Sequence, residues 1–178
     1  IFHPVFIPIY VIYFITKIQP YLFFGNRYNT PFWVIARTAL IYTFFPLVTV
    51  LLLKGLNFIS SIHLKTQKDR IIPFIVCIIW YFWAWLVNKN LSGTSVSIVS
   101  FNLAVFLGCI LGMLANIYFK ISMHAIAMGI MLTTVLVLAR TDSYVSGLYI
   151  ALAFLITGIV CTSRLIVSTH TSFEIYAG

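Results

Sequence analysis

The sequence predicts an all-α integral membrane protein, a bundle of about six transmembrane helices. Of its 178 residues, 62% are hydrophobic and 8% are charged, a composition well outside the range of soluble globular domains. The polar residues fall in short intervals between apolar runs, most of which are long enough to cross a bilayer as a helix. The runs lack the alternation of barrel strands, and lipid requires the backbone hydrogen bonds of each span to be satisfied internally, so we expect helices.

Six apolar runs define the expected spans, and the whole chain, 1–178, is expected to form one transmembrane domain. The first run is short and the sequence begins at Ile1 rather than Met, so we expect an incomplete N-terminus. The second run is long enough for a tilted crossing. The predicted spans cover about residues 2–16, 32–55, 71–88, 96–119, 123–139 and 144–162.

The charge balance indicates a membrane protein rather than a nucleic-acid-binding protein. The net charge is +8, but the Lys and Arg residues stand singly between apolar runs and form no basic face. They divide almost evenly between the two membrane faces, so the positive-inside rule does not choose an orientation. The three cysteines lie inside apolar segments without metal-ligand spacing, so we expect neither a bound metal nor another cofactor.

Counting crossings places three polar clusters on one membrane face. Polar residues occur at 60–70, at Ser122 and His124, and from Ser163 to Glu174. Two predicted crossings separate each cluster from the next, so three of the four histidines should meet at one surface. The fourth, His3, stands beside Pro4 in the first run and is expected to be a packed or interfacial histidine.

The last cluster has the residue types of a phosphoryl-transfer site. On a helix, Glu174 would lie one turn after His170, where its carboxylate would fix the tautomer of the imidazole and raise its basicity. Arg164 precedes His170 by six residues and is close enough in sequence to hold an anion that the histidine attacks.

These residues resemble the signatures of the type 2 phosphatidic acid phosphatase and vanadium haloperoxidase superfamily. Ser163-Arg164-x5-His170-x3-Glu174 is similar to its third signature, Ser-Arg-x5-His-x3-Asp, and 121–124 to its second, Pro-Ser-Gly-His. The first signature, Lys-x6-Arg-Pro, corresponds to His63-x6-Arg70. The resemblance covers about residues 60–178, the expected phosphatase-like core. Departures from the family pattern are His63 for Lys, Ile71 and Ile121 for Pro, Met123 for Gly, and Glu174 for Asp.

The resemblance implies a metal-independent membrane phosphatase that acts on a lipid phosphate or an isoprenoid pyrophosphate. In that family pattern His170 is the nucleophile, Glu174 orients it, and His124 is the general acid and base. The phosphate would be held by Arg70, Arg164, Ser122 and His63, with Lys65 or Lys68 supplying the cation that His63 replaces. The resemblance favours an external or periplasmic position for this face of a multi-pass protein.

Two other functions compete with this interpretation. The altered first and second signatures favour a structural subunit that keeps the fold without the chemistry, bound to membrane protein partners in a larger complex. Alternatively, Arg37, Asn102 and Asn116 within the spans would line the path of a small transporter. The sequence shows no internal repeat or pair of broken helices of the transporter kind, so this last alternative is the weakest.

Overall fold

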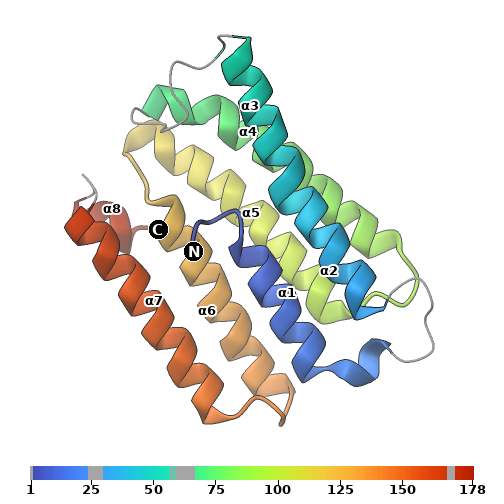
Figure 1. The fold of residues 1–178 in the computed structure, drawn as a ribbon. Coiled ribbons are helices and arrows are strands. Elements are labelled where there is room, and N and C mark those ends of the chain that lie inside the picture. Colours follow the sequence, from blue (N-terminus) through green and yellow to red (C-terminus); the bar gives the residue numbers. More distant parts are fainter. Residues whose placement is uncertain (1, 24–29, 57, 59–66, 168–170) are drawn as a thin grey trace.

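The computed structural model describes residues 2–23, 30–56, 58, 67–167 and 171–178 (Figure 1). All regular secondary structure in these ranges is helical, and five helical segments are long and apolar enough to cross a membrane. The predicted all-α membrane class is therefore confirmed. The elements are α1 (Ile7–Ile18), η1 (Pro20–Phe23), α2 (Pro31–Ala39), η2 (Leu40–Phe44), α3 (Phe45–Gly55), α4 (Gln67–Asn90), α5 (Val96–Tyr118), α6 (Met123–Thr141), α7 (Gly147–Val167) and α8 (Ser172–Tyr176).

The first predicted span differs most from the structure. It is the helix α1, which begins at Ile7 rather than residue 2 because a turn occupies the residues after Pro4 and Pro8 stands in the first turn of the helix. Its 12 residues extend for about 18 Å, less than the ~30 Å thickness of a bilayer core. Both Ile12 and Ile15 are fully buried, so α1 belongs to the packed interior of the bundle.

The second span is continuous but irregular. The helices α2 and α3 are joined by η2, a π-helical segment that ends just before Pro46. Proline has no N–H to donate to the carbonyl one turn earlier, and its ring crowds that carbonyl, so a local change in helical pitch is expected here. The segment Pro31–Gly55 therefore remains helical throughout and is long and apolar enough to cross a membrane.

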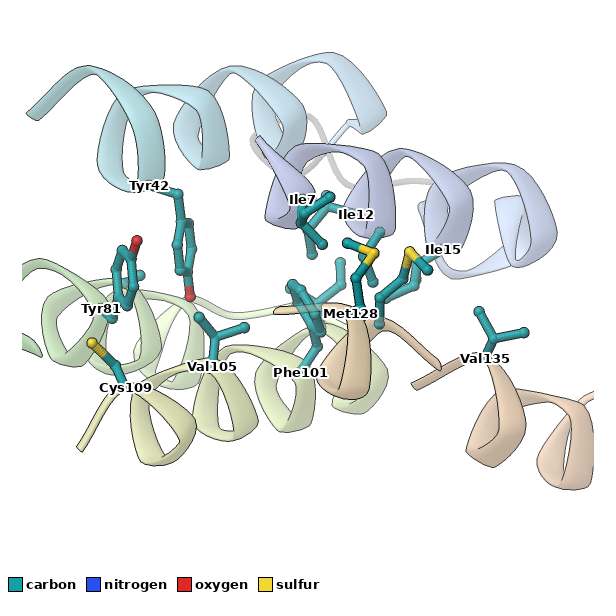
Figure 2. Close-up of a cluster of buried hydrophobic side chains, with 14 of the residues drawn as sticks. Ile7, Ile12, Ile15, Tyr42, Tyr81, Phe101, Val105, Cys109, Met128 and Val135 are labelled. Carbon is teal, nitrogen blue, oxygen red and sulfur yellow. The ribbon is translucent and has the colours of Figure 1, made fainter. Parts of the chain in front are cut away.

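The core lies where α1, η2, α4, α5 and α6 meet (Figure 2). The Tyr42 ring lies 4.7 Å from the Tyr81 ring, centroid to centroid, and its hydroxyl donates a 2.7 Å hydrogen bond to Oδ1 of Asn102. Such bonds satisfy polar groups that lipid cannot. Arg37 of α2 similarly donates to Oδ1 of Asn88 on α4, at 2.9 Å. Arg37 and Asn102 thus each have a hydrogen-bond partner on a neighbouring helix.

The glycine pair in α5 allows close contact with α6. A Cβ atom at Gly108 would come within 2.6 Å of Cδ1 of Ile130, and one at Gly112 within 2.7 Å of Cδ1 of Ile126. The two glycines, four residues apart, therefore form a helix-packing face of α5.

A polar cluster ties α1 to the turn between α6 and α7. The Asp142 carboxylate accepts hydrogen bonds from Nε2 of Gln19 (3.0 Å), the hydroxyl of Tyr21 (2.9 Å) and the backbone N–H of Tyr144 (3.0 Å). These donors, the Tyr144 N–H foremost, lower the pKa of Asp142. The cluster lies at the end of α6 opposite to His124.

Candidate functional site

The predicted site residues that the structure describes gather where α4 and α6 begin and α7 ends, beside the short helix α8 (Figure 1). Ser122 is the N-cap of α6: its hydroxyl accepts a hydrogen bond from the backbone N–H of Ala125 at 3.4 Å, and the side chain is fully buried. Its own backbone N–H donates to the carbonyl of Glu174 at 3.2 Å. This bond joins α8 to the start of α6.

His124 and Arg164 are in direct contact. Arg164 stands in the last turn of α7, which packs along α6, and its guanidinium nitrogen lies 3.1 Å from Nε2 of His124. A guanidinium has only donors and stays protonated, so Nε2 of His124 accepts this bond. In this arrangement the neutral His124 ring therefore carries its proton on Nδ1.

Arg70 brings α4 to the same place. It stands in the first turn of α4, and its guanidinium donates a 3.0 Å hydrogen bond to the carbonyl of Ile121, immediately before Ser122. The charges of Glu174 and Arg164 both act on it. Arg70, His124 and Arg164, each half-buried, thus come together from three different helices.

Glu174 stands in the first turn of α8, which begins at Ser172 after the N-cap residue Thr171. Its predicted partner His170 lies outside the described residues. A capping box explains where α8 begins. The Glu174 side chain accepts from the backbone N–H of Thr171 at 3.0 Å, and the Thr171 hydroxyl accepts from the N–H of Glu174 at 3.3 Å.

The structure thus brings together five predicted site residues: Arg70, Ser122, His124, Arg164 and Glu174. Three more predicted residues, His63, Lys65 and His170, lie outside the described residues. Ser163 and Arg164 were expected after the sixth span, but both belong to α7, which continues to Val167.

The structure adds one residue that the sequence interpretation left aside. The His3 ring lies 5.6 Å from the His124 ring, centroid to centroid, with the planes at 80°. The crossing count could have found it, since two predicted spans separate His3 from the 60–70 cluster. It was placed within the first run rather than before it, because only the structure shows that α1 begins at Ile7.

The described charges at this site favour an anion. Two guanidinium groups are present, and the single carboxylate, that of Glu174, is engaged in the capping box. Within the described part of the chain, no three His, Cys, Asp or Glu side chains are placed to hold a metal ion together. Arginine forks are suited to the oxygens of a phosphate or carboxylate.

A groove of about 950 Å³ runs beside the site, between α5 and α6. It extends from Gly178, near Ser122, towards Gln19 at the opposite end of the bundle, and its walls are mainly apolar. A lipid chain or a further membrane helix can pack in a groove of this kind.

Comparison with known proteins gives no relative for this chain: no family model, curated protein or solved structure matches it.

Proposed function

We propose that this chain is a membrane phosphatase that hydrolyses a lipid phosphate or an isoprenoid pyrophosphate through a phosphohistidine intermediate. The observation that carries the proposal is the meeting of Arg70, His124 and Arg164 at one end of a membrane bundle. A cationic group that binds phosphate and a nearby imidazole that transfers protons are the smallest set of groups that metal-independent phosphoryl transfer requires.

The contact between Arg164 and His124 suggests how substrate prepares the acid. While the guanidinium donates to Nε2, that nitrogen cannot carry a proton. A phosphoryl oxygen is a stronger acceptor for the guanidinium than a neutral imidazole is. Substrate therefore draws Arg164 away and leaves Nε2 of His124 free to bind a proton and donate it to the leaving oxygen.

The reaction then has two steps. A ring nitrogen of His170 attacks phosphorus and forms the P–N bond, while the P–O bond to the lipid breaks and His124 transfers its proton to the departing oxygen. Water next attacks the phosphohistidine, and His124 takes a proton from it as the P–N bond breaks. The products are inorganic phosphate and the lipid alcohol, or the lipid monophosphate when the substrate is a pyrophosphate.

The position of the site supports a lipid substrate. Arg70 opens one membrane-spanning segment, while His124 and Arg164 lie in the terminal turns of two others. A phosphate there lies at the depth of the lipid headgroups, and an attached hydrocarbon tail stays in the bilayer.

Phosphate release by the purified protein in lipid nanodiscs tests the proposal. The substrates are phosphatidic acid, as a lipid monophosphate, and farnesyl pyrophosphate, as an isoprenoid pyrophosphate. We expect turnover of at least one, its loss in Arg164→Ala, and its retention in the matched variant Arg140→Ala, at the opposite end of α6 from His124. Equal activity of the two arginine variants would contradict the proposal.

The alternative is a phosphatase-like structural subunit of a larger membrane complex. The replacements at His63, Ile121 and Met123 favour it, and so does the small buried share of α7, 11% over its most apolar stretch, which leaves room for another protein. Folded protein that releases no phosphate from either substrate would favour this alternative.

A further inference from the structure

The residues before α1 contribute a histidine to the site. His3 lies edge-on to His124 of α6, with ring centroids 5.6 Å apart, and the charge of Arg164 on α7 also acts on it. The position is maintained by the packing of α1 against α5 and α6, where Ile12 and Ile15 are fully buried. His3 therefore lies near His124 and Arg164, the two residues that act on the phosphate in the proposed function.

The hydrogen bonding of His3 defines its tautomer. Its Nδ1 atom accepts a bond from the backbone N–H of Val5 at 3.4 Å, so the neutral ring carries its proton on Nε2. The His3 side chain is nevertheless exposed. His3 is thus a hydrogen-bond donor at Nε2, whereas Nε2 of His124 is an acceptor.

The electrostatic environment of His3 favours its neutral form. Partial burial, and next the positive charge of Arg164, lower the pKa of His3, and its neighbours His124 and Arg164 give no ion-pair stabilisation to its charged form. An imidazole beside another imidazole and near a guanidinium needs an anion to become stable as a cation. A phosphoryl group held by Arg164 supplies that anion.

We propose that His3 is a further phosphate-binding residue of this site, donating Nε2–H to a phosphoryl oxygen of the substrate. This inference rests on the proposed function. Its chemistry requires only a phosphoryl group within hydrogen-bonding distance, as in a lipid phosphate, a pyrophosphate or inorganic phosphate. The bound dianion would also favour protonation of His3 and so strengthen the contact.

Steady-state kinetics of His3 variants provide the first test. His3→Ala removes a hydrogen bond to a charged group, so we expect kcat/KM to fall by about 10-fold to 100-fold, mainly through KM. His3→Gln keeps an N–H donor and should restore most of the affinity. Phe2→Ala, which removes the neighbouring exposed aromatic ring, is the matched control and should leave KM unchanged. Wild-type kinetics in His3→Ala, or equal losses in the Ala and Gln variants, would overturn the inference.

Binding of inorganic phosphate provides a second test that does not need turnover. The protein is labelled with ¹⁵N-histidine, the His3 signals are assigned from the His3→Gln spectrum, and the pKa values of His3 and His124 are measured with and without phosphate. We expect phosphate to raise both. If phosphate raises the pKa of His124 but not that of His3, the inference is overturned, whereas the proposed function is not contradicted. If phosphate raises the pKa of both histidines but the protein has no turnover, the inference is supported and the proposed function is not. If phosphate changes neither pKa, the inference is overturned.

Discussion

Nε2 of His124 lies 3.1 Å from the guanidinium of Arg164, although 40 residues separate the two in sequence. The two residues stand on neighbouring antiparallel helices, at the ends that share one membrane face. Arg164 thereby contacts the His124 ring directly, and the same guanidinium is the proposed phosphate ligand.

The first prediction concerns the shape of the Arg164 cation. Arg164→Lys keeps the charge but loses the planar fork that contacts an imidazole and two phosphoryl oxygens. We expect kcat/KM to fall by about 10-fold to 100-fold, as for the loss of one or two charge-assisted bonds. Phosphate release from the preferred lipid measures this, and Arg140→Lys, with unchanged kinetics, is the control. A fully active Arg164→Lys would show that only the charge matters.

The second prediction concerns the two proposed chemical groups. His170→Ala should abolish phosphate release, because no nucleophile remains to form the P–N bond. His124→Ala should slow turnover by about 10²-fold to 10⁴-fold, the usual contribution of general acid and base catalysis. Rapid acid quenching with ³²P-labelled substrate should trap phosphoprotein in the wild type and none in His170→Ala. Full turnover in His170→Ala would remove the assignment.

The third prediction separates the two contributions of Glu174. Gln at this position still closes the capping box, so Glu174→Gln should keep α8 in place and lose only the negative charge that acts on Arg70. Glu174→Ala also loses the side-chain bond to the backbone N–H of Thr171, whereas the Thr171 hydroxyl can still accept from the backbone N–H at position 174. We expect activity to decrease from wild type to Gln to Ala. Equal activities in the Gln and Ala variants would mean that the Glu174 side-chain bond has no part in positioning the site.

The fourth prediction concerns stability at the opposite end of the bundle. The pKa of Asp142 is lowered in the folded protein, so its charged form stabilises the fold above the unfolded pKa of about 3.9 and loses this effect as pH falls through the folded pKa. Asp142→Asn should therefore have a lower Tm than wild type at pH 7. The Tm difference should shrink as pH falls below about 4. Tyr21→Phe, which removes one of the three donors, should show a smaller decrease.

The fifth prediction concerns His63, which replaces the family lysine. A histidine with an ordinary pKa of about 6.5 loses its charge near neutrality, whereas a lysine does not. If His63 holds phosphate, turnover should weaken as pH rises past neutrality, and His63→Lys should extend activity to higher pH. Superimposable pH–rate profiles would exclude His63 from the site and direct attention to Lys65 and Lys68.

The arrangement of the candidate site could largely be predicted from the sequence, because a membrane limits each helix to one of two directions. Once the spans were counted, Arg70, His124 and Arg164 were expected to emerge on one face. In the structure His124 contacts Arg164, and Arg70 bonds to the nearby Ile121 carbonyl. Counting membrane crossings does not reveal which helices are neighbours. The crossing count therefore could not predict that Arg164 reaches Nε2 of His124 or that Arg70 bonds to the Ile121 carbonyl.

Local interactions account for the differences. Thr171, whose hydroxyl caps the start of α8, places Glu174 in the first turn of a new helix, a boundary that the sequence analysis did not predict. The first span was misplaced because its hydrophobic run does not reveal the turn after Pro4. His3 remained outside the predicted site for the same reason, since its position depends on where α1 begins.

The bond between Gln19 and Asp142 also constrains the order of biogenesis. The two residues are 123 positions apart, and at about 5–20 residues per second a ribosome needs roughly 6–25 s to synthesise the chain between them. During this interval two residues that flank α1 lack their partners near the two ends of α6: Gln19 lacks Asp142, and His3 lacks His124 until α6 is made. The helix α1 is therefore made well before α6, and these contacts can form only after α6 and the following turn have been synthesised.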